Sequence, residues 1–336
     1  MTSATPNPPA DEVAQESTAR RLLRSAPILQ IFALIVLVIV TAATISGFLS
    51  QTSIYATLVL ASFLGIAAAG QTLVILIGGI DLSVPALISG ANLVSTLLSG
   101  AGWPFGLDIL AVLAAAGVVG AINGFVIHRL RVAPLIVTLA TGAMVTGGTL
   151  GWTRGGQVSG QVPGWLTSFS SPIGTVVGIK IPPIIVLWAV VAIVLSIVLH
   201  LSVTGRRLYA TGANERAAVL AGVRTERVWI GAFAISAIAA AMVGILLTGF
   251  TGTGEAGVGD PYLFESLAAV LVGGTSLVGA RGDYMRTVLG ALILTVMTTL
   301  LVGHGAGEAV QEILFGVLIL LFVAVYGRDQ RVRDRV

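Results

Sequence analysis

The stretch Gln71-Thr-Leu-Val-Ile-Leu-Ile-Gly-Gly-Ile-Asp-Leu-Ser83 places a single carboxylate in an otherwise apolar part of the chain. Asp81 is the only charged residue between Ser25 and Leu107. An Asp at the centre of a membrane helix costs roughly 2.5–3.5 kcal/mol on insertion scales. The two glycines before it favour a helix break, where backbone groups become available. The stretch therefore indicates a functional site at a broken helix inside a membrane protein.

The composition places the whole chain in the membrane class. Of its 336 residues, 56% are hydrophobic and 10% are charged, whereas a soluble domain is about 25% charged. The 42 glycines are typical of helices that pack closely in a bilayer. There is no cysteine, which excludes disulfides, thiolate metal sites and cysteine nucleophiles. The net charge of +3 does not indicate a nucleic-acid partner.

Apolar segments and basic residues together predict the topology. A spanning helix needs about 20 apolar residues, and the chain divides into ten such segments: 28–48, 57–77, 84–100, 109–128, 133–152, 183–203, 229–251, 263–279, 287–303 and 310–326. With a cytoplasmic N-terminus, only Arg154 and Lys180 among the basic residues of the connections fall outside, as the positive-inside rule requires. We expect an all-α integral membrane protein with about ten transmembrane helices, some short or broken, and both termini in the cytoplasm.

The same division predicts the domain organisation. Residues 1–25 are expected to form a disordered cytoplasmic tail, residues 26–327 a single transmembrane domain, and residues 328–336 a basic cytoplasmic tail. The outer segment 153–182 is either a partly folded cap or an irregular loop.

The inner connection, residues 204–228, carries a helix signal of its own. Asn214 is a suitable N-cap, Glu215 to Ala221 are good helix formers, and Gly222 suits the position after the helix end. A short capped helix between two spans on the cytoplasmic face has the shape of a docking element.

Two segments of the chain resemble each other. Leu73 to Leu82 (LVILIGGIDL) and Ala268 to Leu277 (AAVLVGGTSL) both place a Gly-Gly pair after an aliphatic run. Repeated halves with broken helices are a recurrent transporter plan, but ten residues of similarity are also compatible with chance.

Catalytic constellations are missing from the sequence. The three histidines are far apart at span ends, and no His-Glu-x-x-His motif occurs. Lys180, the only lysine, has the wrong neighbours for a P-loop. We therefore expect no catalytic residue, cofactor or metal site in this chain, and an intramembrane enzyme is disfavoured. If ATP drives transport, a separate subunit must bind it.

Polar side chains within the spans suggest what the chain transports. The set comprises Gln71, Thr72, Ser83, Asn92, Asn123, Thr138, Thr141, Ser266, Thr275 and Ser276. Each of them alone is better explained by hydrogen bonds between helices. Together they favour a pathway for a neutral polar solute over one for an ion, which would need more intramembrane acids.

Four motifs in order resemble the permease subunits of bacterial ABC importers for monosaccharides, of the ribose, xylose and arabinose type. They are Gly78-Gly-Ile-Asp-Leu-Ser-Val84, then Gly120-Ala-Ile-Asn-Gly124 followed by Arg131-Val-Ala-Pro-Leu-Ile-Val-Thr-Leu139, then the stretch from Tyr209 to Val223, and finally Leu267 to Gly279. The similarity covers residues 57 to 326, and four motifs in the right order are a specific signal.

The resemblance implies a pore-forming subunit of the bacterial plasma membrane that imports a sugar or sugar-like polyol. Its implied partners are a cytoplasmic subunit that binds ATP with magnesium, an extracytoplasmic solute-binding protein, a second permease copy, identical or related, and membrane lipid. Within the same family a nucleoside, a furanone signal or a branched-chain amino acid are alternative solutes. A self-sufficient secondary carrier is the alternative from another class.

The motifs also imply roles for individual residues. Expected pathway or gating residues are Gln71, Gly78, Gly79, Asp81, Ser83, Asn92, Asn123, Thr138, Gly273, Gly274, Thr275 and Ser276. Expected residues of the element that couples to the ATPase are Gly212, Asn214, Glu215, Ala217, Ala218 and Gly222.

Pro85 and Ala280 depart from the family pattern, and the predicted topology favours a structural role for Asp81. Pro85 and Ala280 stand where the family more often has glycine, so the local backbone there is in question. With full-length spans on both sides, Asp81 is expected at the tight inner turn between two spans or at a break near it. It would then cap the next helix by accepting N–H groups near Ser83 and Val84, which favours a structural and gating role over direct solute contact.

Overall fold

The computed structural model describes residues 27–154, 157–160, 162–175 and 180–333. The tail expected at residues 1–25 lies outside them. The elements are α2 (Ile28–Thr44), α3 (Gln51–Leu76), α4 (Val84–Gly100), α5 (Phe105–Leu130), α6 (Pro134–Thr153), β1 (Val158–Ser159), α7 (Gly164–Ser170), α8 (Pro183–Leu201), α9 (Val203–Ala213), α10 (Glu215–Leu220), α11 (Thr225–Thr251), β2 (Thr253–Gly254), α12 (Tyr262–Val272), α13 (Tyr284–Gly303) and α14 (Glu308–Arg333).

Helices account for nearly all the regular structure, as the sequence predicts. Six of them, α3, α5, α6, α8, α11 and α13, are long and apolar enough to cross a membrane, and α2, α4 and α12 are shorter apolar helices. Each of the ten expected segments contains a helix. The number of crossings and the side on which the termini lie stay predictions. α14 runs to Arg333, past the domain end expected at residue 327.

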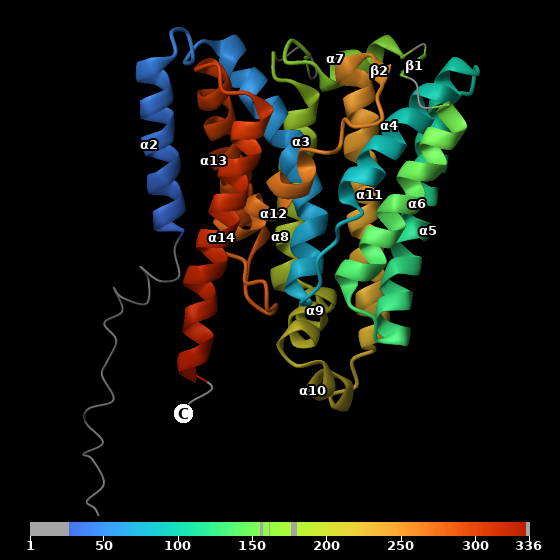
Figure 1. Ribbon diagram of the computed structural model, residues 1–336, viewed down its shortest axis with the longest axis vertical. Coiled ribbons are helices and arrows are strands. Elements are labelled where there is room, and N and C mark those ends of the chain that lie inside the picture. The colour runs from blue at the N-terminus through green and yellow to red at the C-terminus, as the bar shows by residue number, and fades with distance from the viewer. Residues whose placement is uncertain (1–26, 155–156, 161, 176–179, 334–336) are drawn as a thin grey trace, which may run out of the picture.

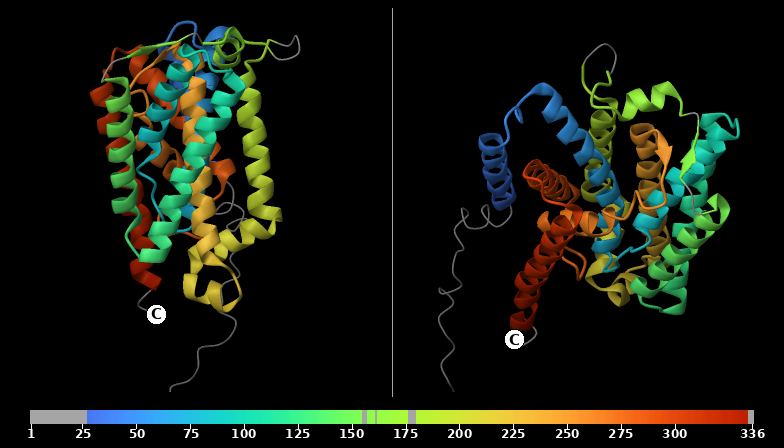
Figure 2. Two further views of the ribbon diagram at one scale, coloured as in Figure 1. Left: turned by 90° about the vertical axis from the view of Figure 1, so that its right-hand side faces the viewer. Right: turned by 45° about the horizontal axis from the view of Figure 1, so that its top comes forward.

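The core of the bundle is formed by α3 and α11, which pack against each other (Figure 1). α3 is apolar on all sides and buried along most of its length, as expected for a helix surrounded by others. α2 and α14 lie on one flank and α5 and α6 on the other (Figure 2). These outer helices expose Ile, Leu and Val side chains, which is the surface that lipid would cover.

The two ends of the bundle differ. At one end, β1 pairs antiparallel with β2 and the short helix α7 lies beside them (Figure 1). The segment 153–182 is therefore partly folded over the residues described. At the opposite end, α10 forms a tip beneath α9, α3 and α8, and α14 also reaches this end of the bundle (Figures 1 and 2).

Two connections interrupt the bundle rather than link complete spans. Between α3 and α4 the chain turns and runs back along α11 as a short segment without regular structure before α4 begins (Figure 1). The second break separates α12 from α13. With 11 residues, α12 is about 16 Å long, too short to cross a hydrocarbon core of about 30 Å. The expected span 263–279 is helical only as far as Val272.

Candidate translocation and coupling site

The first break ends α3 with a glycine motif. Gly78 adopts a left-handed conformation with φ of +81°. Its N–H donates to the carbonyl of Ile75 at 2.9 Å, and that of Gly79 donates to Val74 at 2.9 Å. This pair of bonds is the Schellman motif, which satisfies the last carbonyls of a helix and needs a residue free to adopt positive φ.

The second break ends α12 in the same way. Gly274 has φ of +90° and its N–H donates to Leu271 at 2.8 Å, while that of Thr275 donates to Val270 at 3.1 Å. The similarity seen in the sequence thus corresponds to a shared mode of helix termination. The structural equivalence is shifted by one residue, because Gly78 matches Gly274 rather than Gly273.

An aspartate precedes both following helices, Asp283 as the N-cap of α13 and Asp81 two residues before the N-cap of α4. Asp81 Oδ1 accepts from the N–H of Ser83 at 3.0 Å at the start of α4, and Asp283 Oδ1 accepts from Met285 at 3.3 Å at the start of α13. Asp81 accepts the Ser83 N–H as expected, but Ser83 is itself the N-cap residue of α4, and no side chain caps that helix. Pro85 falls in the first turn of α4, where no hydrogen bond from its nitrogen is needed.

Of the two positions expected for Asp81, the structure shows the one near a helix break and not the one at the tight turn between two complete spans. Asp81 Oδ2 accepts from the hydroxyl of Ser236 at 2.8 Å, about three turns into α11, and Asp81 is 2% exposed. The turn itself occurs at Gly78 and Gly79. The chain then returns into the bundle, passes Asp81 and begins α4 at Val84. Full-length spans on both sides had been assumed, but α4 begins inside the bundle.

A polar network extends from Asp81 across three helices. Asn123 of α5 donates to the Ser83 hydroxyl at 3.5 Å, and Thr141 of α6 donates to the Asn123 side-chain oxygen at 2.6 Å. Thr138, also on α6, accepts from the N–H of Leu82 at 3.1 Å. The structure therefore brings together four of the expected site residues: Asp81, Ser83, Asn123 and Thr138. It adds Ser236, which carries no distinguishing signal in the sequence of α11.

Two other expected pathway residues have contrasting surroundings. Asn92 is fully engaged, donating to Thr248 at 2.9 Å and accepting from the N–H of Glu255 at 2.7 Å, so it joins α4 to α11 and to the chain after β2. Gln71 of α3 is completely buried, and neither polar atom of its side chain has a partner among the described residues. A buried amide without partners is costly, so the Gln71 side chain has hydrogen-bonding capacity that the described residues do not use.

The loop of the second break contains the remaining pathway residues. The hydroxyl of Thr275 is buried and has no hydrogen-bond partner within the part of the chain described. The N–H of Ser276 donates to Arg281 at 2.8 Å. Gly273 packs closely on the backbone of α13, since a Cβ there would lie 2.6 Å from the Arg286 carbonyl oxygen.

Gly212 of α9 lies where the two breaks meet. A Cβ on Gly212 would lie 2.0 Å from the carbonyl oxygen of Leu76, at the end of α3, and 2.9 Å from the nitrogen of Ala280 in the second loop. Ala280 itself donates to Leu76 at 2.8 Å. A Cβ on Gly279 would lie 3.2 Å from the Gly212 carbonyl oxygen. The sequence did not predict that this glycine contacts both breaks.

A tyrosine secures α9 to the second loop. The Tyr209 hydroxyl donates to the carbonyl oxygen of Gly282 at 2.8 Å. Burial, and secondarily the charge of Asp283, raise the pKa of Tyr209 above its usual value. The phenol therefore keeps the proton that it donates.

The capped helix expected after α9 is confirmed. In α10, which starts at Glu215, the Asn214 side chain accepts from the N–H of Ala217 at 3.0 Å, and Gly222 has φ of +81° beyond the helix end. The helix ends at Leu220, one residue earlier than expected. Ala218 is its buried residue.

The remaining contacts of α10 define its surface. Glu215 pairs with Arg131 at 3.1 Å and lies 3.0 Å from His128, which ties α10 to the turn between α5 and α6. Val219 and Leu220 are 53% and 90% exposed at the tip of the bundle. A charged anchor on one side and exposed aliphatic side chains on the other are features of a docking helix.

The fold and site define a helical membrane transporter subunit: a bundle with two interrupted helices whose breaks meet beside α9. Comparison of the sequence with known proteins adds the family. The sequence model of the family described as branched-chain amino acid transport system, permease component, matches residues 53–323. The chain belongs to this family. It is therefore a multi-pass permease component of an ABC importer in the bacterial inner membrane, and not an enzyme.

Individual relatives agree with this assignment. The chain is 34% identical to the ribose import permease protein of Bacillus subtilis, over 86% of this chain and 89% of the relative. It is 30% identical to the Escherichia coli K12 protein of the same description, over 89% and 93%. It is 32% identical to the fructose import permease protein of Rhizobium meliloti, over 81% and 76%. The comparison with solved structures finds no match.

Proposed function

We propose that this chain forms the membrane pore of an ATP-driven importer for a sugar or sugar-like polyol, and that the end carrying α9 and α10 faces the cytoplasm. The observation that carries the proposal is the contact of Gly212 with both helix breaks. It connects a projecting capped helix directly to the interrupted part of the bundle.

The proposed coupling runs in three steps. A cytoplasmic ATPase receives α10 through the exposed Val219 and Leu220 side chains. Displacement of α10 shifts α9, since the two helices share Asn214 as the last cap of one and the first cap of the other. α9 then moves the end of α3 against the second loop, which biases a bundle with two arrangements.

The proposed solute is neutral and hydroxylated. Relatives carrying the names of ribose and fructose permeases support a sugar. The buried amide of Gln71 offers a donor and an acceptor, which suits a hydroxyl group. The family description names branched-chain amino acids, so such a solute is the second candidate. Binding measurements on the solute-binding partner proposed for this chain would decide between them.

Replacing residues 215–221 by a Gly-Ser linker tests the coupling. We expect ATP-dependent uptake to be lost while the protein stays in the membrane. A secondary carrier has no need for this helix, so unchanged uptake would overturn the proposal.

A sharper experiment targets docking alone. Leu220→Glu places a charge on the tip of α10, and we expect the ATPase subunit to be lost from the purified complex. Ile173→Glu is the matched control, because Ile173 is 82% exposed at the opposite end of the bundle. Equal ATPase recovery with the two variants would contradict the proposed orientation.

A further inference from the structure

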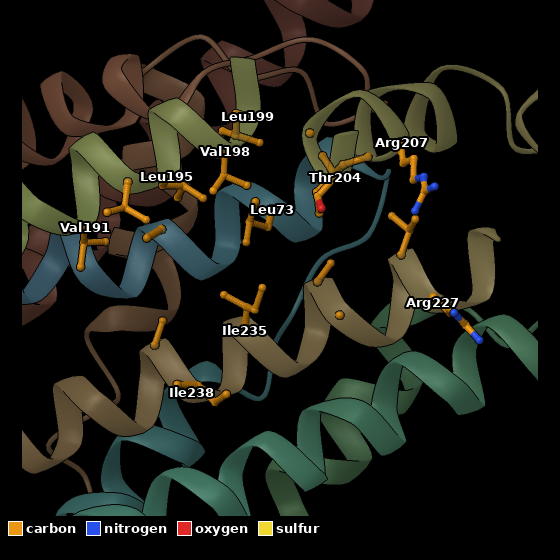
Figure 3. A pocket seen from close by; sticks show the side chains of 18 of the residues that line it. Leu73, Val191, Leu195, Val198, Leu199, Thr204, Arg207, Arg227, Ile235 and Ile238 are labelled. Atoms are coloured by element: carbon orange, nitrogen blue, oxygen red, sulfur yellow. The ribbon is translucent and has the colours of Figure 1, made fainter. Parts of the chain in front are cut away.

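A long groove lies between α8 and α11, away from the polar network. It has a volume of about 940 Å³. Val191, Leu195, Val198 and Leu199 of α8 form one wall and Ile235 and Ile238 of α11 the other, with Leu73 of α3 between them (Figure 3). Val194 and Ile235 line it and are about half exposed, so the groove opens on the outer surface of the bundle.

One end of the groove is basic. Arg207 of α9 and Arg227 of α11 lie at this end (Figure 3), and Arg224 lines it too. All three are exposed, and none of them takes part in the ion pairs formed among the residues described. The basic end is the end of the bundle that carries α9 and α10.

The dimensions match one leaflet of a bilayer. From Arg227 to Met242, the lining residues of α11 extend over about 22 Å at 1.5 Å per residue. Half of a bilayer with its headgroups is about 20–22 Å thick. The arginines then lie at headgroup depth and the aliphatic walls at acyl-chain depth.

We propose that this groove binds an anionic phospholipid of the cytoplasmic leaflet, with the phosphate on Arg207, Arg224 and Arg227 and an acyl chain between α8 and α11. Guanidinium groups bind phosphate with two parallel hydrogen bonds. Basic pockets between membrane helices on the cytoplasmic side are suited to anionic headgroups.

Two other occupants fit less well. A sugar needs several polar groups that converge on it, and apart from Thr204 the walls between the arginines and Met242 are lined by apolar residues. A second copy of the chain in a two-fold contact would bring the arginines of one groove towards those of the other, and like charges repel across an interface. The placement of the three arginines in the cytoplasmic leaflet rests on the proposed function, but lipid binding itself requires no ATPase.

The proposal is tested with the purified full-length chain by native mass spectrometry. The chain is titrated with phosphatidylglycerol or with phosphatidylcholine of the same acyl chains. We expect phosphatidylglycerol to bind at least about tenfold more tightly. Arg207→Gln with Arg227→Gln is expected to weaken phosphatidylglycerol binding by roughly 10- to 30-fold and to leave phosphatidylcholine binding unchanged.

Two further variants control for charge and for shape. Arg129→Gln with Arg206→Gln removes two exposed arginines that do not line the groove, and we expect wild-type lipid binding. Gly231→Leu fills the groove without changing charge, because a Cβ at Gly231 meets nothing within 4 Å. We expect it to weaken phosphatidylglycerol binding at least about fivefold, with an unchanged thermal unfolding midpoint.

Three results would overturn the proposal. Equal affinity for the two lipids would show general lipid contact rather than a site. Equal losses in the two arginine pairs would show a diffuse charge effect. A dimer that Gly231→Leu dissociates and that phosphatidylglycerol does not affect would show that the groove is an interface between copies.

Discussion

The breaks before α4 and before α13 begin alike and are held differently. Each starts with a left-handed glycine, Gly78 or Gly274, and has an aspartate that accepts a backbone N–H at or just before the next helix. In the first, the aspartate is buried and bonded to α11, and the neighbouring residues bond to α5 and α6. In the second, Thr275 has a buried hydroxyl without a described partner, and the side chain of Asp283 is 23% exposed.

This difference assigns different tasks to the two breaks. A buried network with its hydrogen bonds made fixes geometry, because each bond lost leaves a costly unpaired group. A loop held mainly by backbone contacts breaks fewer buried side-chain hydrogen bonds when it shifts, so its movement costs less free energy. We infer that the first break is the fixed frame and that the second loop is the part that α9 moves.

The largest effect is expected at Asp81. Asp81→Ala removes the acceptor for the Ser83 N–H and the Ser236 hydroxyl. We expect a loss of about 1–3 kcal/mol in the free energy of unfolding and at least a tenfold loss of uptake. Asp283→Ala, the matched change in the second break, removes one partly exposed cap and should cost about 1 kcal/mol. Equal losses in denaturant unfolding would break the comparison.

Asp81→Asn separates structure from proton transfer. The amide keeps an acceptor for Ser83, so we expect uptake to fall by a similar factor at every pH between 5 and 8. A shifted pH profile of uptake would instead show that the carboxyl group titrates during transport.

Two threonine substitutions give the next effect. Thr141→Val removes the donor to Asn123 and should destabilise the protein by about 1–2 kcal/mol. Thr275→Val removes a buried hydroxyl that has no described partner, so we expect a change within about 0.5 kcal/mol of zero or a small gain. The pair is compared by chemical unfolding in the same detergent, and a reversed order would contradict the assignment of the fixed frame.

The last effect is a gain in stability rather than a loss, and it is expected at Ala280. This residue has φ of +59°, a left-handed conformation that costs a residue with a Cβ about 1–2 kcal/mol. Ala280→Gly should therefore raise stability by about 0.5–1 kcal/mol after the entropy of glycine is counted. A lower unfolding midpoint for Ala280→Gly would show that the left-handed backbone at Ala280 does not destabilise the protein.

Local signals in the sequence predicted much of this site. Asn214 and Gly222 identify α10 because caps act on adjacent residues, and Asp81 was expected to cap for the same reason. The family motifs named Asn123 and Thr138, which the fold joins to Asp81. Contacts between distant segments could not be predicted from the sequence. Ser236 is one serine in an apolar helix, and the contact of Gly212 with Leu76 depends on how α9 packs. The inward return of the chain was missed because apolar length does not distinguish a complete span from a broken one.

We propose that α9 transmits ATPase motion to the two breaks through the close contact at Gly212. Gly212→Ala adds one methyl group against Leu76, whereas Gly147→Ala adds one where nothing lies within 4 Å. The measurement is the ratio of sugar taken up to ATP hydrolysed in proteoliposomes holding the complete importer. If α9 transmits the motion in this way, Gly212→Ala keeps ATP hydrolysis and lowers this ratio at least tenfold, while Gly147→Ala behaves as wild type. An unchanged ratio in Gly212→Ala would contradict it.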